Sequence, residues 1–220
     1  MNVAVFGSSG HGGVVAEAIL SQGTQNFVGW IDSFRSPGDI VGSYRVLGSE
    51  KDIPDLLAQR CFDGLAIAIG DNWQRAQVAE RLQPLCRSGL VFVTVIHPNA
   101  NISTSAVIGE GTVVLSGAVI TAHSRVGRFC IVNTSASLDH DCVMADYSSL
   151  APKTATGGRV SIGEYSAVSI GAIIVHRIVI GHHCLIGAGA TVLRNVPDHA
   201  VCYGTPAKTV RYRTTGESYL

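Results

Sequence analysis

The sequence has few charged residues, few aromatic residues and no long hydrophobic run. Charged residues make up 15% of the 220 residues and hydrophobic residues 46%, a composition that argues against a long disordered region. The 16 basic side chains are balanced by 16 acidic ones, so neither nucleic acid nor an anionic membrane surface is indicated as a partner. No apolar run approaches the roughly 18 residues of a membrane span, and the N-terminal sequence lacks the basic region of a secretory signal. We therefore expect a soluble, cytoplasmic protein.

Paired cysteines are absent as well. None of the six cysteines forms a C-x-x-C pair, so neither a zinc knuckle nor a redox dithiol is indicated. Disulfides are not expected in the reducing cytosol. We expect no bound metal.

The first half of the chain alternates predicted strands with predicted helices. Strands are expected over residues 2–6, 27–31, 64–69 and 90–96, and helices over 14–21, from 49 onward and over 73–86. Ser49 and Asp52 resemble a capping box at the start of the second helix. The alternation predicts a Rossmann-like α/β domain with a parallel sheet and right-handed crossovers.

A glycine-rich loop, residues 7–13, joins the first predicted strand to the first helix. The helix N-terminus after such a loop offers N–H donors and a positive dipole to a phosphate. Asp32 ends the second strand, where an acidic residue commonly meets a ribose hydroxyl. The spacing is G-x-x-G-x-G-G and not the G-x-G-x-x-G typical of NAD-binding proteins. A nucleotide site and a tight turn without a ligand both stay open from the residues alone.

The second half repeats with a period of six residues. Of the sixteen positions counted in steps of six from Ile102 to Val192, fifteen are aliphatic or methionine and only Thr156 departs. The positions four residues later are mostly small, which fits a narrow prism interior and makes Cys130, Cys142 and Cys184 core residues. An unbroken period of six over this length is the mark of a hexapeptide β-helix.

This half resembles the hexapeptide-repeat acyltransferases, whose β-helices are left-handed with three hexads per coil. The resemblance implies that residues 18 apart stack on adjacent coils, with the ordinary strand spacing of about 4.8 Å. Such a prism exposes strand edges at both ends. We expect the first domain to cover one end and the C-terminal tail to cover the other.

Motifs from both halves extend the resemblance over nearly the whole chain. They are FGSSGHGG at 6–13, WID at 30–32, IAIGDN at 67–72, IHPNANIS at 96–103, NTSASLDHDC at 133–142 and GTPAK at 204–208. In this order they are similar to the bacterial family of nucleotide-amino-sugar N-acetyltransferases and sialic acid O-acetyltransferases. The resemblance implies a Rossmann-like nucleotide-sugar-binding domain over 1–96, a left-handed β-helix acetyltransferase domain over 97–194 and a capping tail over 195–220.

The resemblance also implies the catalytic residues. His140 matches the family's catalytic histidine, which takes a proton from the acceptor and returns one to the thiolate. Asp141 matches its acidic neighbour, which orients the imidazole, and we expect it to stack over His123 on the preceding coil. Asp139 is a second carboxylate for the same role. The alternative for His140 is a solvated turn residue without a catalytic part.

In the family, acetyl-CoA lies in a groove between neighbouring subunits of a homotrimer. The matching positions are Gly158, Ile170 and Ala188, and Lys208 either approaches the phosphates or adenine or is a solvated lysine. Two positions depart from the pattern: Ser149 stands near the acetyl group where many relatives carry a second histidine, and Lys153 stands where a glycine is usual. Both leave the identity of the acceptor open.

For the first domain, the resemblance implies binding of the acceptor's nucleotide. The residues expected to contact this nucleotide-linked amino sugar are Gly7, Ser8, Gly10, His11, Gly12, Asp32, Asn72 and Arg75. The expected reaction is acetyl-CoA-dependent N-acetylation of the 4-amino group of a UDP- or dTDP-linked deoxy amino sugar, in bacterial surface glycan biosynthesis.

Three other functions use the same sequence features. O-acetylation of sialic acid or another sugar would use the same fold and His140. A γ-type carbonic anhydrase would use histidine ligands for zinc, but His140 and His176 stand two coils apart, about 9.6 Å, which is too far for one zinc ion within one chain. A scaffold that binds a sugar nucleotide without reacting is the third.

Overall fold

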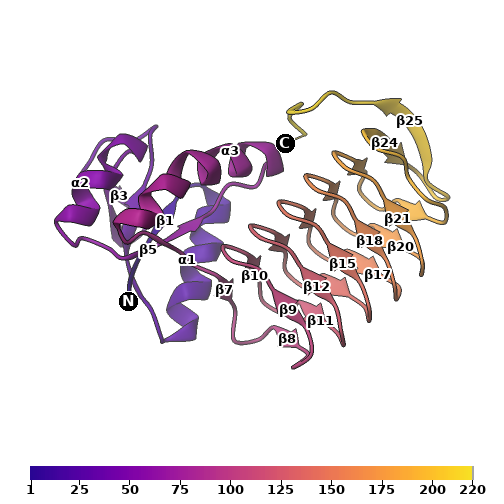
Figure 1. Ribbon diagram of the computed structural model, residues 1–220, viewed down its shortest axis with the longest axis horizontal. Helices are drawn as coiled ribbons and strands as arrows, with labels where there is room; N and C mark the ends of the chain where they lie inside the picture. Colours follow the sequence, from indigo (N-terminus) through magenta and orange to yellow (C-terminus); the bar gives the residue numbers. More distant parts are fainter. Residues whose placement is uncertain (220) are drawn as a thin grey trace.

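The computed structural model describes residues 1–219 as an α/β domain followed by a β-helix (Figure 1). The α/β domain lies at one end of the β-helix, beside its first coils. From the far end of the β-helix the residues before 220 run back toward the α/β domain (Figure 1), and the Tyr219 hydroxyl accepts a hydrogen bond from the amide of Asn72, the first residue of helix α3 (Asn72–Leu82). Both halves thus match the predicted Rossmann-like domain and left-handed parallel β-helix.

The α/β domain is a six-stranded sheet with the order β3-β4-β2-β1-β5-β6, parallel except for β3. Its strands are β1 (Asn2–Phe6), β2 (Asn26–Ile31), β3 (Ile40–Val41), β4 (Tyr44–Gly48), β5 (Gly64–Ile67) and β6 (Val91–Phe92). Its α-helices are α1 (Gly10–Gln22), α2 (Ile53–Ala58) and α3 (Asn72–Leu82), with 3-10 helices η1 (Glu50–Asp52) and η2 (Gln83–Ser88). The order reverses between β1 and β5, which makes the carboxyl ends of these two strands the switch point of the sheet.

Most predicted elements of this domain are present, although α1 begins at Gly10, inside the predicted loop, and two further differences concern the strands. The Ser49–Asp52 capping box is formed in both directions. The hairpin of β3 and β4 was not predicted, although it extends the sheet, and Val46 in it is buried. The predicted strand over 90–96 is two strands, because β6 ends the α/β sheet while β7 (Val95–Ile96) pairs with the β-helix. The β-helix therefore begins at Val95, before the predicted boundary.

From β7 to β23 the β-helix is a three-sided prism of two-residue strands, in which strands 18 residues apart pair in parallel. Face 1 holds β7, β10 (Val113–Val114), β13 (Ile131–Val132), β16 (Ser149–Leu150), β19 (Ala167–Val168), β22 (Leu185–Ile186), β24 (Ala200–Tyr203) and β25 (Lys208–Tyr212). Face 2 holds β8 (Asn101–Ile102), β11 (Val119–Ile120), β14 (Ser137–Leu138), β17 (Ala155–Thr156), β20 (Ile173–Ile174) and β23 (Thr191–Val192). Face 3 holds β9 (Val107–Ile108), β12 (Arg125–Val126), β15 (Val143–Met144), β18 (Ser161–Ile162) and β21 (Val179–Ile180).

The predicted register is confirmed residue by residue. Each of the sixteen positions from Ile102 to Val192 is the second residue of a strand, and all but Ile102 and Ile108 are buried in the prism. Cys130, Cys142 and Cys184 are fully buried among them. Burial raises the pKa of the Cys130 and Cys184 thiols to about 11, which keeps them protonated and unreactive.

Face 1 is the side of the prism that the rest of the chain covers. Helix α1 lies between the α/β sheet and the first coils, so that Val15 and Ile19 share a core with Val113 and Leu115. At the far end, β24 continues face 1 and β25 pairs antiparallel with it. The segment after β25 then returns along face 1, where Tyr219 contacts Ala167, Leu185 and Val201.

The edge between faces 3 and 1 bears a column of stacked rings. Phe129, Tyr147, Tyr165, His183 and His199 follow one another on successive coils with nearly parallel planes. Trp73 of α3 packs edge-on against the Tyr165 ring at 5.3 Å. The α/β domain is therefore fixed to face 1 and to this edge, and residues 1–219 leave the edge between faces 2 and 3 uncovered.

Candidate active site

His140 and Asp141 stand in a turn at the uncovered edge between faces 2 and 3. The register places Leu138 and Met144 inside the prism, so the residues between them form the turn. Main-chain hydrogen bonds tie the turn to both neighbouring coils: the Asp141 amide donates to Ala122 O, and the Arg159 amide donates to His140 O. The two side chains therefore project from a rigid backbone toward the outside.

The His140 ring is paired with Asp141. Its Nδ1 lies 2.8 Å from Oδ2 of Asp141, and because a carboxylate only accepts hydrogen bonds, the proton is assigned to Nδ1 and the lone pair to Nε2. The hydrogen bond from His140 holds the pKa of Asp141 below its usual range, with further contributions from the charges of His140, Arg159 and His123. Asp139 instead accepts a 2.8 Å hydrogen bond from the His140 main-chain amide, so it is Asp141 that orients the ring.

A groove of about 350 Å³ runs from His140 onto the next two coils, lined by His140, Gly158, Arg159, His176 and Arg177. The His140 ring lies directly over Gly158, where a Cβ atom would collide with Nε2. A glycine is thus required for the observed ring position. The ring of His140 and the backbone of Gly158 thus meet at the wall of this groove.

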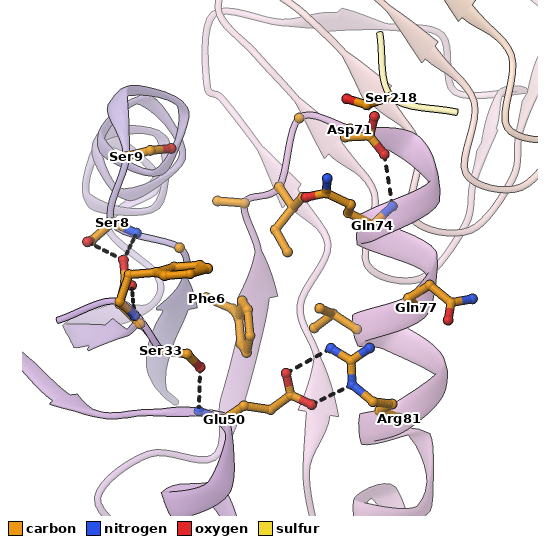
Figure 2. Close-up of a pocket in the computed structure, with 17 residues that line it drawn as sticks. Phe6, Ser8, Ser9, Ser33, Glu50, Asp71, Gln74, Gln77, Arg81 and Ser218 are labelled. Carbon is orange, nitrogen blue, oxygen red and sulfur yellow. Dashed lines mark hydrogen bonds and ion pairs between the residues drawn. The ribbon is translucent and has the colours of Figure 1, made fainter. Parts of the chain in front are cut away.

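A second cavity, of about 650 Å³, lies in the α/β domain at the carboxyl ends of β1, β2 and β5 (Figure 2). This is the switch point of the sheet, where ligands of open α/β folds bind. Gly7, Ser8 and Asp32, which the sequence predicts as ligand contacts, line it. The structure brings these three together as expected.

Asp32 organises the loop after β1. Its Oδ2 accepts hydrogen bonds from the Ser8 amide and hydroxyl, and its Oδ1 accepts one from the Phe34 amide. Arg35 Nε donates to Ser8 Oγ at 2.9 Å. Burial raises the pKa of Asp32, but the hydrogen bonds from Ser8 and Phe34 outweigh it, and the pKa lies below the usual range. Asp32 is therefore an ionised anchor that fixes the rim of the cavity.

Other residues of this cavity were not predicted from the sequence. Phe34 lines it and is 98% exposed, an unusual state for a phenylalanine. On the opposite wall, Arg81 makes two hydrogen bonds of 2.7 and 2.9 Å to Glu50 (Figure 2). Phe34 lies only two residues beyond the predicted Asp32. Its position just after the end of a strand was the one feature of the sequence that could have pointed to it.

Asn72 and Arg75 require a correction, since the sequence predicts them as ligand contacts and the structure buries both completely. Arg75 donates to main-chain oxygens of Phe129, Ile69, Gly70 and Tyr147 and to the Asn72 side chain, which occupies its five N–H donors. The Asn72 side-chain amide donates to main-chain oxygens of Tyr165 and Ser166. Both therefore join the α/β domain to the β-helix.

Gly10, His11 and Gly12, also predicted contacts, form the first turn of α1 and do not belong to the residues that line the cavity. Gly12 is needed for packing, because a Cβ atom there would collide with Gly7 O. Burial lowers the pKa of His11 to about 4, with a smaller effect from the charge of Arg75, and its Nε2 is buried without a hydrogen-bond partner among residues 1–219. These three residues belong to the helix that packs against the loop after β1.

Comparisons with known proteins agree with this arrangement. Residues 2–82 match the PglD N-terminal domain family. PerB from Caulobacter crescentus, solved with CoA and GDP-perosamine, is 34% identical, with a TM-score of 0.87 over 95% of this chain and 97% of that one. The acetyltransferase domain of PglB from Neisseria gonorrhoeae, solved with acetyl coenzyme A, is 35% identical, with a TM-score of 0.86 over 95% and 98%. The chain belongs to the hexapeptide-repeat sugar N-acetyltransferases.

A curated relative agrees with the assignment to this acetyltransferase family. The UDP-N-acetylbacillosamine N-acetyltransferase of Bacillus subtilis is 39% identical over 129 residues, which are 52% of this chain and about half, 51%, of that protein. The predicted family, fold and enzyme class are thereby confirmed. Among residues 1–219, no three His, Cys, Asp or Glu side chains gather as a metal site would require, and no helix has the length and apolarity to cross a membrane.

The remaining residues predicted to bind the cofactor lie elsewhere in this sugar N-acetyltransferase. Ile170 and Ala188 stack on adjacent coils at the edge between faces 1 and 2, where both are exposed. Lys208 is exposed on β25. Ser149 is nearly buried on face 1 beside Tyr219. Within one chain, Gly158 alone of the predicted cofactor residues lies next to His140.

Proposed function

We propose that this protein transfers the acetyl group of acetyl-CoA to the amino group of a nucleotide-linked amino sugar, with His140 as the general base. The observation that carries the proposal is the His140–Asp141 pair, which aims Nε2 into the groove over Gly158. A histidine held in one tautomer by a carboxylate is suited to accept a proton from a nucleophile. The switch-point cavity supplies a separate place for the nucleotide.

The reaction follows from these positions. The amine of the sugar attacks the thioester carbonyl, and His140 Nε2 takes a proton from the attacking nitrogen as the C–N bond forms. Asp141 stabilises the imidazolium. We propose that the Gly158 amide donates a hydrogen bond to the developing oxyanion. The C–S bond then breaks, and the CoA thiolate takes the proton from His140.

The acceptor's nucleotide is proposed to occupy the cavity of the α/β domain. Phe34, on the rim beyond β2, offers an exposed aromatic face on which a base stacks. Gly7 and Ser8 border the place where a pyrophosphate meets the loop after β1. The Bacillus subtilis relative is named for a UDP-linked sugar and PerB was solved with GDP-perosamine, so GDP joins the UDP and dTDP of the sequence-based expectation as a candidate nucleotide.

We also propose that the working form is a homotrimer. Within one chain the cavity lies with the α/β domain over face 1, whereas His140 stands on the opposite edge. A nucleotide sugar bound in the cavity therefore needs the His140 of a neighbouring copy. The edge of Ile170 and Ala188, with Lys208 beyond it, is proposed to face that neighbour across the acetyl-CoA groove.

The test is release of free thiol from acetyl-CoA with UDP-, dTDP- and GDP-linked 4-amino sugars and with free sialic acid as acceptors. We expect turnover with one amino sugar and a loss of about 10²–10⁴-fold in kcat for His140→Ala. His182→Ala, which removes an exposed histidine from the edge between faces 3 and 1, is the control and should retain activity. Turnover with sialic acid alone would assign the protein to O-acetylation, and full activity of His140→Ala would overturn the role of His140.

A further inference from the structure

Thr156 is the one polar residue among the sixteen inward positions of the hexapeptide register. It ends β17 on face 2, in the column that also contains Ile120, Leu138 and Ile174, and it is 8% exposed. Burying a hydroxyl where an aliphatic side chain would fit costs free energy unless the hydroxyl has a partner. Thr156 lies on the coil that directly follows the coil of His140.

The hydrogen bonds of face 2 show what the hydroxyl does. On this face the residue after each strand donates its amide to the main-chain oxygen of the inward residue one coil on: Thr121 to Leu138 O at 3.0 Å, and Gly157 to Ile174 O at 2.8 Å. Asp139 departs from this series. Its amide donates at 3.0 Å to the Thr156 hydroxyl oxygen, so the side chain takes the place of the main-chain acceptor.

From Asp139 a short series of contacts leads to the base. Asp139 Oδ1 accepts the His140 amide at 2.8 Å, and the Thr121 hydroxyl approaches the same oxygen at 3.3 Å. The His140 ring is then held by Asp141 above Gly158. The Thr156 hydroxyl thus sets the backbone at the start of the turn that carries the base.

We infer that Thr156 is a positioning residue for His140, and that its hydroxyl fixes the height of the imidazole over Gly158 by holding the Asp139 amide. This inference rests on the proposed role of His140. An aliphatic residue at 156 would fit the register, and the Asp139 amide would then bond to the main-chain oxygen as on the other coils. The turn would shift, and the ring with it.

The experiment compares Thr156→Val, which keeps the shape and removes the hydroxyl, with Thr156→Ser, which keeps the hydroxyl. Because misplacement of a catalytic group by about 1 Å can cost about 100-fold in rate, we expect kcat of Thr156→Val to fall by about 10- to 100-fold. The KM for the nucleotide sugar and the melting temperature should stay at the wild-type level, and Thr156→Ser should retain most of the wild-type kcat.

Thr112→Val is the matched control, since Thr112 is a fully buried hydroxyl that donates to Gly127 O and accepts the Cys130 amide, away from His140. It should lower the melting temperature and leave kcat unchanged. Wild-type kcat in Thr156→Val, or equal losses in the Val and Ser variants, would overturn the inference. A crystal structure of Thr156→Val separates this from failure of the proposed function: the Asp139 amide should move to the main-chain oxygen of residue 156 even if His140→Ala retains activity.

Discussion

The two halves of this protein build their sites in different ways. In the β-helix, His140, Gly158 and His176 lie at one edge because they are 18 residues apart in register, and each turn is tied by main-chain hydrogen bonds to the coils beside it. In the α/β domain, the cavity is formed by loops after β1, β2 and β5 together with Ser218, which is far away in the sequence. The first site is a shallow groove on a rigid edge, and the second is a deeper cavity between loops.

The two halves also differ in where they place their polar groups. The β-helix exposes the chemistry of the proposed base and keeps small neutral residues inside. The α/β domain buries polar and charged groups, among them Arg75, Asn72 and the Nε2 atom of His11, to hold its loops and its contact with the β-helix. Substitutions in the β-helix edge should therefore act on rate, whereas those in the α/β domain should act on stability and on nucleotide binding.

The largest expected effect is the one of His11, in the α/β domain, on the pH dependence of stability. An unfolded histidine titrates near pH 6.5, but burial, with a smaller effect from Arg75, lowers the pKa of His11 to about 4. As the pH falls, His11 therefore binds a proton in the unfolded chain before it does so in the folded one. Its contribution to the free energy of unfolding is fully present above about pH 6.5 and is lost as the pH falls toward 4. The shift corresponds to about 3 kcal/mol.

His11→Gln should remove most of this dependence. The measurement is the free energy of unfolding by urea at pH 7.5, 6.0, 5.0 and 4.5 for wild type, His11→Gln and His123→Gln. The His123 variant, changed at an exposed β-helix position, should follow the wild-type curve. If the His11 variant loses stability with acid as steeply as wild type, the acid sensitivity belongs to another group.

How much the sequence predicted also differs between the halves. A period of six assigns every residue of the β-helix to a face or to the interior, so the inward column and the place of His140 followed directly from counting. Thr156 stands out in the sequence as the one polar residue of the inward column. Its bond to the Asp139 amide depends on whether that amide donates to the side chain or to the main-chain oxygen on the next coil. Periodicity does not encode that choice.

In the α/β domain, the elements were predictable and their contacts were not. Arg75 and Asn72 follow β5 at the switch point, where polar residues often meet a ligand. Here the β-helix supplies main-chain oxygens to both, and no local pattern foretells a partner 54 to 94 residues away. Phe34 was missed for the same reason, because its exposure results from how the loop folds around Asp32.

The next largest effect should come from the β-helix edge, at Gly158. Gly158→Ala adds a methyl group that collides with the His140 ring, and since a ring at the end of a side chain can turn away, the fold should survive. We expect kcat to fall by about 100-fold as the base is displaced, with an unchanged melting temperature. Gly13→Ala, where an added Cβ atom meets nothing within 4 Å, is the control and should retain wild-type kcat. Normal turnover of Gly158→Ala would mean that the ring position seen here is not the working one.

The smallest of the three effects should come from the cavity rim, at Phe34. The side chain is almost fully exposed, so Phe34→Ala should leave the melting temperature unchanged. Because stacking of one base on an aromatic ring is worth about 1–3 kcal/mol, we expect the KM for the nucleotide sugar to rise by about tenfold, and Phe34→Tyr to preserve it. The kcat and the KM for acetyl-CoA should stay constant, because the reacting groups lie on the β-helix. A rise in the KM for acetyl-CoA instead would place the cofactor, and not the sugar nucleotide, in this cavity, and it would reverse the assignment of the two sites.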